Sequence, residues 1–261
     1  MKSLANSSAF TAKEIMENMR TKKLLVLLCV FIFLAILSAL TARFMGEIMA
    51  AVMSAEGATE MIIVLPDAVW TDSYAQLYSN LTQIGIIALI MLYMGSILRE
   101  KSSGTVDLMM AKGLTPAAFV FSKFAVAAAI TLLSLLVAVL VTYVYTLVLF
   151  EYGGQIGNVL FGAVPFAVFL LTMLAITMMW SAIAKSTATS AVLGLCSFFA
   201  MMLFDFVPWL GRFMPGTLLG HGVVMSAGVT PEGVVVQIVV ALMIMVLALW
   251  VAVVALKRRE G

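Results

Sequence analysis

The sequence predicts an all-α polytopic membrane protein with six transmembrane helices. Of its 261 residues, 64% are hydrophobic and only 11% are charged, whereas a soluble domain of this length carries about 25% charged residues. Six apolar runs approach or exceed the length of about 20 residues that crosses about 30 Å of hydrocarbon. These runs are uninterrupted, whereas strands of a membrane barrel are about ten residues long and alternate in polarity. Helices packed as one transmembrane domain over 1–261 are therefore expected.

The six expected spans follow from where the apolar runs begin and end. They are 24–43, 76–98, 116–150, 160–184, 187–207 and 234–256. The apolar part of the second span is short, so its helix is expected to begin upstream, at Tyr74 or Gln76, with tyrosines at the depth of the interface. The third is longer than a membrane requires, so its first turns are expected in the cytoplasm.

The distribution of charge predicts how the spans are oriented. Lysine and arginine gather on the side that holds the N-terminus, whereas acidic residues such as Glu47, Asp72 and Glu151 lie mostly on the other side. Cytoplasmic loops of membrane proteins carry an excess of Lys and Arg, so both termini are predicted to be cytoplasmic. An even number of spans agrees with this orientation. The expected location is the inner or plasma membrane of the cell.

Residues 8–22 form a candidate amphipathic helix before the first span. Thr11 and Glu14 fit a capping box at its start. The expected apolar face comprises Ala12, Ile15, Met16 and Met19, and the expected polar face comprises Lys13, Glu14, Glu17 and Asn18. Such a helix is predicted to lie along the inner leaflet. The alternative is a cytoplasmic extension of the first span.

Two segments are expected on the outer side. The loop 44–75 and the start of the second span carry Trp70, Tyr74 and Tyr78, which are expected to form an interfacial belt, with a substrate-lining role as the alternative. The segment 208–230 is apolar but is interrupted by prolines and glycines. It predicts short re-entrant helices before the sixth span, since a plain surface loop would be more polar.

The polar insert 99–115 between the second and third spans predicts a short cytoplasmic helix at about 104–112. Ser102, Ser103 and Thr105 offer hydroxyls that could cap its start. Asp107 and Lys112 have the charges that the helix dipole favours in the first and last turns. Val106, Met109 and Met110 form an apolar face too small to span a membrane.

The end of this short helix and the start of the next are marked as well. Gly113 is a suitable left-handed terminator. Thr115 and Pro116 then fit the cap and the first position of a new helix that continues into the third span.

Several classes of function find no support in the residues. His221 is the only histidine, and Cys29 and Cys196 lie within predicted spans, so neither a metal site nor a disulfide framework is expected. The chain has no phosphate-binding loop, so we expect it to bind no ATP and not to be an enzyme. Its spans carry almost no ionisable groups, which argues against an ion-coupled carrier or a selective ion channel. The energy for any transport must then come from another protein.

The insert resembles the signature of ABC-2 type permeases, the membrane subunits of ABC exporters. The matching residues are Glu100, Lys101, Gly104, Thr105, Pro116 and Lys123. The sequence departs from the family at Ala117 and Ala118, where Ser-Arg is frequent, and at Ser122, where Gly is frequent. The layout of six spans, an N-terminal interfacial helix and an interrupted outer segment extends the resemblance over the whole chain.

The resemblance implies that 99–113 is a coupling helix, which docks in a groove of a separate ATPase subunit. The residues expected to carry this contact are Glu100, Gly104, Thr105, Val106, Asp107, Met109, Met110 and Lys112. It also implies two ATPase subunits per complex, which bind ATP and Mg, and a second copy of the permease or a homologous chain. Membrane lipid is a further expected partner, and nucleic acid is not.

The leading hypothesis is therefore the permease subunit of an ATP-driven exporter, whose substrate is a drug, a peptide, a lipid or a glycan. The alternative is a non-transporting membrane subunit that does mechanical or assembly work with extracytoplasmic partners. An intramembrane enzyme is a third hypothesis, which the absence of a recognisable catalytic motif disfavours.

Overall fold

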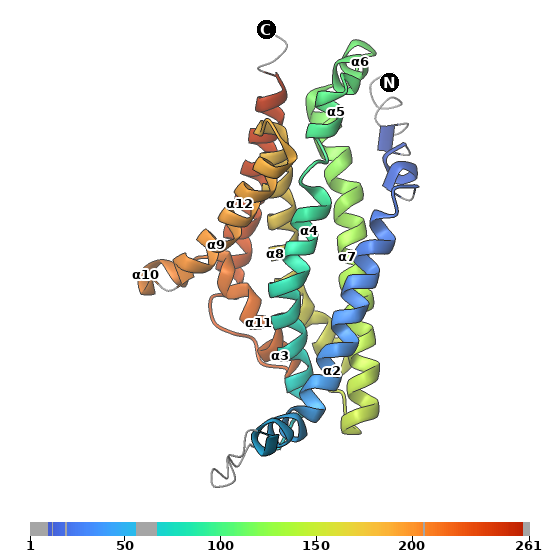
Figure 1. Cartoon of the computed structure of the whole chain (residues 1–261). Coiled ribbons are helices and arrows are strands. Elements are labelled where there is room, and N and C mark those ends of the chain that lie inside the picture. The colour runs from blue at the N-terminus through green and yellow to red at the C-terminus, as the bar shows by residue number, and fades with distance from the viewer. Residues whose placement is uncertain (1–9, 12, 19, 56–66, 206, 258–261) are drawn as a thin grey trace.

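The computed structural model describes residues 10–11, 13–18, 20–55, 67–205 and 207–257, which form helices joined by turns, with no strand among them (Figure 1). The helices that follow the N-terminal segment are α2 (Lys23–Ala55), α3 (Trp70–Asn80), the π-helix η1 (Leu81–Gly85), α4 (Ile86–Tyr93), α5 (Leu98–Ser102), α6 (Thr105–Ala111), α7 (Pro116–Phe150), α8 (Ile156–Ile183), α9 (Thr187–Asp205), α10 (Pro208–Gly211), the 3₁₀-helix η2 (Pro215–Thr217), α11 (Leu218–Ser226) and α12 (Val234–Lys257).

Six helical stretches of the described chain are long and apolar enough to cross a membrane. They are Lys23–Ile48, Trp70–Ser102, Pro116–Phe150, Ile156–Ile183, Thr187–Asp205 and Val234–Lys257. The predicted fold class, an all-α protein with six candidate spans, is therefore confirmed.

Helix α8 lies at the centre of the bundle. It packs against α7, α9, α11 and α12, and side chains on it such as Phe166 and Phe169 are fully buried. Large apolar side chains on α9 and α12, including Leu203 and Trp250, are mostly exposed. Such a surface suits contact with lipid, because lipid tails are as apolar as leucine and do not drive these side chains inward.

The two ends of the bundle differ in what they carry. The short helices α5 and α6, the described N-terminal helical residues and the last turns of α12 lie at one end, whereas the end of α2 and the start of α3 lie at the other (Figure 1). The insert 99–115 therefore projects from the same end of the bundle as the first and the last described residues.

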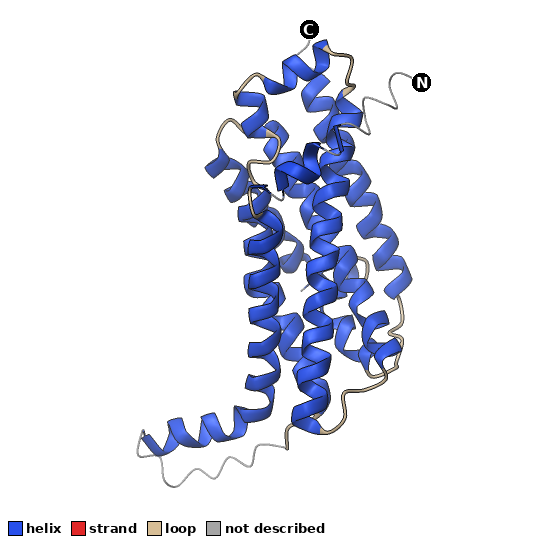
Figure 2. Cartoon of the chain, turned by 90° about the vertical axis from the view of Figure 1, so that its right-hand side faces the viewer, coloured by secondary structure: helices blue, strands red, loops and turns tan. Residues whose placement is uncertain are grey.

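Helix α2 is longer than the predicted first span 24–43. It continues to Ala55, so the first part of the predicted outer loop 44–75 is helical, and its last turns bend away from the bundle (Figure 2). Residues 44–55 are rich in Met and Ala and contain no Pro, and such residues favour a helix whatever the membrane depth. Hydropathy marks where a helix leaves the membrane and does not mark where the helix ends.

The second span begins earlier than the predicted Tyr74 or Gln76 and is not a continuous α-helix. It starts at Trp70, where the Val69 N–H donates to Asp72 Oδ2 at 2.9 Å. A π-helical turn at 81–85 and a turn at 94–97 then interrupt it. Two N–H groups freed at the second interruption, those of Ile97 and Leu98, donate to Ser181 Oγ of α8 at 3.0 and 3.1 Å, so a neighbouring helix satisfies them.

The aromatic side chains at the start of this span do not form the expected belt. Tyr74 is fully buried and Tyr78 is 2% exposed, and the Tyr74 hydroxyl donates to the Gly153 carbonyl at 2.7 Å. The Trp70 ring packs edge-on against Tyr152. Trp70 and Tyr74 thus join α3 to the turn between α7 and α8, and the Tyr78 ring packs against Phe166 of α8.

The remaining long helices lie close to their predicted bounds. Helix α7 spans 116–150 as predicted, and its end is marked by Glu151 in the left-handed conformation at φ 59°. Helix α8 starts at Ile156 rather than at 160, α9 ends at Asp205 rather than at 207, and α12 ends one residue beyond the predicted 256.

The interrupted outer segment 208–230 folds into α10, η2 and α11. Helix α11 packs against α8 and α3, so it belongs to the bundle and is not a surface loop. The His221 Nε2 lies 2.6 Å from the Gln237 Oε1 of α12, which gives this lone histidine a partner inside the fold. Whether the segment is re-entrant with respect to a membrane stays a prediction.

Candidate functional site

The insert between the second and third spans forms two short helices joined by a tight turn. Gly104, at φ 72°, is the cap residue of α6, and no side chain accepts a bond there. The predicted capping by Ser102, Ser103 and Thr105 is therefore wrong, and the Ser103 hydroxyl lies 2.8 Å from the Thr105 hydroxyl instead. The chain reverses between α5 and α6 through a left-handed residue, a conformation that glycine adopts without the steric cost that a Cβ atom brings.

The far end of α6 follows the prediction. Gly113 has a φ of 88° and terminates the helix, and its N–H donates to the Met110 carbonyl at 2.9 Å. Thr115 then caps α7 by accepting from the Ala118 N–H at 3.2 Å, with Pro116 at the first helical position. The two caps fix the direction in which α6 leaves the base of α7.

The apolar face of α6 packs on its own chain. Val106 is 6% exposed, and Met109 and Met110 are partly buried against the same core. The opposite face carries Asp107 and Leu108, which are both exposed, and 58% of Leu108 is accessible. The expected contact residues include Val106, Met109 and Met110 but not Leu108, because a pattern of three apolar residues identifies a face of the helix without indicating what covers it.

The other predicted contact residues are divided between the two faces. Gly104 and Lys112 are exposed, Thr105 is intermediate and Glu100 is buried. Only part of the predicted set is therefore presented outward, and Glu100 faces the interior of the chain.

A cluster of charged side chains lies at the base of this insert. Lys123 Nζ of α7 is 2.9 Å from both carboxylate oxygens of Glu14 and 2.9 Å from Glu100 Oε1. Lys13 Nζ is 3.0 Å from the same Glu100 oxygen and 3.0 Å from Glu17 Oε2. We call these five residues the ion cluster; it joins the N-terminal helix, α5 and α7.

Two aromatic rings cover the cluster. Lys123 Nζ lies 5.3 Å from the centre of the Phe119 ring and 6.0 Å from that of Phe10, and Lys13 Nζ lies 5.3 Å from the Phe10 ring. Ring faces attract cations most strongly where water is excluded. The rings therefore stabilise both ammonium groups while limiting access of water.

The cluster also shifts the pKa values of the groups at its edge. Partial burial alone would lower the pKa of Lys13, but the hydrogen bonds to Glu100 and Glu17 and the charge of Glu100 raise it above its ordinary value. Burial acts to raise the pKa of Glu17, and the bond from Lys13 outweighs it and lowers that pKa. Both groups are therefore held in their charged forms over the neutral range.

The three carboxylates could also be considered as ligands for a metal ion. Oxygens of Glu14, Glu17 and Glu100 lie within 4.8 Å of one another. However, the Lys123 and Lys13 nitrogens already bind these oxygens. The donor set thus fits a network of ion pairs better than a cation site.

The N-terminal helix differs from the prediction. Residues 10–11, 13–18 and 20 are helical, and Lys22, at φ 56°, separates them from α2, so this helix is not an extension of the first span. Glu14 and Asn18 were expected on a solvent-facing side and are 3% and 5% exposed. Ala12 and Met19 of the expected apolar face lie outside the described residues.

The predicted capping box is also wrong. Thr11 already lies within helix, and its hydroxyl donates to Ser122 Oγ at 3.2 Å, while Glu14 binds Lys123. The pattern of a capping box was present, but a buried lysine 109 residues away competes for the same carboxylate. Ile15 and Met16 of the expected apolar face are exposed.

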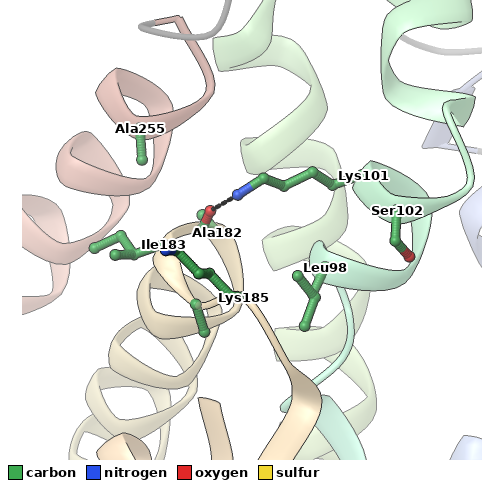
Figure 3. Close-up of a pocket in the computed structure, with 8 residues that line it drawn as sticks. Leu98, Lys101, Ser102, Ala182, Ile183, Lys185 and Ala255 are labelled. Atoms are coloured by element: carbon green, nitrogen blue, oxygen red, sulfur yellow. Dashed lines mark hydrogen bonds between the residues drawn. The ribbon is translucent and has the colours of Figure 1, made fainter. Parts of the chain in front are cut away.

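A second attachment ties the insert to α8. Lys101 Nζ of α5 donates to the Ala182 carbonyl at 2.7 Å (Figure 3). The neighbouring Ser181 Oγ accepts hydrogen bonds from the Ile97 and Leu98 N–H groups at the start of α5. The base of the insert is thus held on two sides, by α7 through Glu100 and by α8 through Lys101.

The fold and this site define a multi-pass helical membrane protein with a folded polar insert at one end of its bundle. The family model described as ABC-2 family transporter protein matches residues 9–224, and the chain belongs to that family. The match begins before the ion cluster and ends within α11, so it includes the insert. Membership implies a membrane subunit that associates with an ABC ATPase. A search of curated proteins finds no match.

Proposed function

We propose that this chain is the permease subunit of an ATP-driven ABC exporter and that α6 is the helix through which a separate ATPase drives it. The observation that carries the proposal is the position of α6. It projects from the end of the bundle where the described chain begins and finishes (Figure 1), and it presents an exposed acid and an exposed leucine. A helix with one face seated on its own bundle and the other face outward is suited to dock in a groove of a partner.

The outward face of α6 supplies the contact. Leu108 is the apolar anchor, and Asp107 and Lys112 provide charges at its rim, with Met109 at the edge. Glu100 and Val106 serve the same contact indirectly, because they fix the insert on the bundle. Burying an exposed leucine in a partner's groove removes its apolar surface from water, while the polar side chains around it remain at the rim of the contact.

The two attachments of the insert provide the route for force. A push on α6 reaches α7 through Glu100 and Lys123, and it reaches α8 through Lys101 and the Ala182 carbonyl. Since α8 is the central helix of the bundle, a small displacement at the insert is passed to the helices packed on it. Coupling of this kind needs a contiguous set of packed and bonded groups, which these residues form.

The complete complex contains two ATPase subunits, which bind ATP and Mg, and a second permease copy or a homologous chain. We place both termini and α6 in the cytoplasm of the cell, because basic residues concentrate at that end. The exported substrate is a drug, a peptide, a lipid or a glycan.

The test is recovery of the ATPase with this chain from its native membrane in mild detergent. Exchanging Asp107→Lys together with Leu108→Glu is expected to lower the recovered ATPase about tenfold or more, because a charge replaces the apolar anchor. Val229→Glu is the matched control, since Val229 and Leu108 are both 58% exposed and Val229 follows α11 at the other end of the bundle.

Two results would contradict the proposal. One is an unmodified chain, folded and intact, that brings no ATPase with it. The other is a double variant that retains the ATPase as well as Val229→Glu does. An ATPase that is retained together with a large extracytoplasmic partner, without ATP-dependent uptake of candidate substrates into inside-out vesicles, would favour mechanical or assembly work over export.

A further inference from the structure

One face of the second span remains exposed over most of its length. Its members are about one helical turn apart, at Ala75, Ser79, Gln83, Ile87 and Met91, and all five are exposed. They form one continuous row along α3, η1 and α4, which we call the exposed stripe. Figure 1 shows α4 in front of α8, with α2 on one side and α9 on the other. The stripe is polar in its middle and apolar toward α5.

Gln83 lies near the middle of the bundle in depth. Three residues before it, Asn80 Nδ2 donates to Ser38 Oγ of α2 at 2.9 Å. Two residues after it, a Cβ atom added at Gly85 would lie 3.3 Å from the Phe31 ring of α2. Phe31 and Ser38 are both about 12 Å or more from the ends of the first candidate span, at 1.5 Å per residue. This depth corresponds to the hydrocarbon core of a bilayer.

An exposed glutamine at this depth contrasts with the other polar side chains of the spans. Thr131, Thr172 and Thr177 are fully buried and donate to carbonyl groups inside the bundle. Gln83 Nε2 donates one hydrogen to Ser79 Oγ at 3.0 Å, and the described residues provide no bond for its second hydrogen or for its carbonyl oxygen. Acyl chains provide none either, and an unbonded amide in hydrocarbon is costly.

We propose that the exposed stripe is the face on which a second copy of this chain packs, with Gln83 at the two-fold axis. A residue on such an axis meets its own counterpart. A carboxamide is its own complement, since each can donate its remaining N–H to the carbonyl oxygen of the other. Glutamine side chains form such bonds between membrane helices.

Two further features agree with this assignment. The remaining donor and acceptor of Gln83 are equal in number, which favours a like partner over an ion of either sign. Gln83 also lies in the π-helical turn 81–85, and turns of this kind are frequent at functional sites. The inference rests on the proposed function only in that it requires a second copy, and it does not depend on the contact between α6 and an ATPase.

The first experiment is disulfide cross-linking in native membranes, with single cysteines in a chain whose two native cysteines are replaced by Ala. Ser79→Cys, Gln83→Cys and Ile87→Cys are expected to yield a covalent dimer of the chain on oxidation. The highest yield is expected at Gln83, because a disulfide requires Cβ atoms within about 4.5 Å. Val246→Cys is the matched control. Val246 is 60% exposed in the middle of α12, away from the stripe, and is expected to yield no dimer.

The second experiment tests the amide itself. Gln83→Leu places an apolar side chain at an apolar depth, so the variant is expected to fold with an unchanged or raised Tm. It is expected to weaken dimerisation about fivefold, measured by dilution of fluorescently labelled copies in phosphatidylcholine vesicles. Gln155→Leu is the matched control, because Gln155 is an exposed glutamine just before α8, and it is expected to change nothing.

Each other outcome would overturn the proposal. The interface would lie elsewhere if no stripe position cross-linked, if Val246→Cys cross-linked equally, or if Gln83→Leu dimerised as well as Gln155→Leu. Cross-linking to a different protein alone would identify a homologous chain as the partner. Rapid labelling of Gln83→Cys in the dimer by a water-soluble maleimide would show that the stripe lines an aqueous passage.

The two proposals can fail separately. A chain that recovers its ATPase but does not cross-link through the stripe would contradict this inference alone. A chain that cross-links through the stripe but brings no ATPase would contradict the proposed function alone.

Discussion

Lys123 is the residue at which three segments of the chain meet. Its side chain is only 5% exposed, and its ammonium group binds carboxylates from the N-terminal helix and from α5. A buried charge is costly unless it is paired and hydrogen-bonded. Lys123 is paired with Glu14 and Glu100, and these bonds offset the cost of burying its charge. The local fold therefore depends strongly on both carboxylates.

Replacing Lys123 by Met is expected to lower the free energy of unfolding by about 3 kcal/mol, because the buried carboxylates of Glu14 and Glu100 then share only the partly exposed Lys13 as a counter-charge. The Tm in detergent measures this loss. Arg20→Met removes an equal charge from an exposed position and is expected to leave the Tm nearly unchanged. If the two variants melted alike, the ion cluster would contribute no stability. Combining Lys123→Met with Glu14→Gln and Glu100→Gln is expected to recover part of the loss, since no unpaired charge then remains.

Among the elements, α11 shows how the half of the bundle away from the insert is closed. A Cβ atom added at Gly162 of α8 would lie 2.5 Å from Ser226 Oγ and 2.7 Å from the Gly222 carbonyl oxygen, both in α11. A Cβ added at Gly222 would lie 2.6 Å from the ring of Tyr78, which is buried. Glycine at both contacts allows α11 to approach α8 and α3 closely, as small residues do between membrane helices.

Gly162→Ala is expected to destabilise the protein by about 1–3 kcal/mol, because the new methyl group meets backbone atoms of α11 that cannot rotate away. Gly157→Ala, in the first turn of the same helix, is the control. A Cβ there has nothing within 4 Å, so the exchange is expected to be neutral or stabilising by up to about 1 kcal/mol. The Tm values of the two variants provide the measurement, and a Gly162→Ala protein as stable as Gly157→Ala would refute close packing of α11.

At the scale of the whole molecule, the two ends of the bundle carry different segments. Ser102 of the insert lies at one end, and Val229, which follows α11, lies at the other, beside the start of α8. A Cβ atom added at Gly228 would lie 2.8 Å from Asn158 Nδ2 in the first turn of α8. Lys101 Nζ donates to the Ala182 carbonyl in the last turn of that helix. If α8 crosses the membrane, the two residues face opposite compartments.

Single cysteines at these two positions test the orientation, in a background where Cys29 and Cys196 are replaced by Ala. A membrane-impermeant maleimide applied to intact cells is expected to label Val229→Cys, and to label Ser102→Cys only after the membrane is opened. The reason is that positively charged segments are retained on the cytoplasmic side. Labelling of Ser102→Cys in intact cells would reverse the orientation and would also place α6 out of reach of a cytoplasmic ATPase.

The sequence by itself determined the class of the protein, its six candidate spans, and the residues at which several helices begin or end. Long uninterrupted apolar runs have few solutions in lipid, because every backbone polar group must be bonded within the segment. Local signals were sufficient where the chain reverses sharply, as at Gly113, Thr115 and Pro116. The resemblance carried by Glu100, Gly104 and Thr105 also led to the family that the comparison confirms.

Only the tertiary structure decided which side chains meet. Glu14, taken from the sequence as part of a cap, binds Lys123 on a distant helix, and Tyr74 and Tyr78 lie in the core and not at an interface. The outward face of α6 also emerged only when its apolar face was seen packed on its own bundle. Local patterns describe what a segment can do alone, whereas burial and ion pairing depend on residues that are far away in the chain. Those distant residues determined which side chains of Glu14, Tyr74 and Tyr78 became buried and which groups they bind.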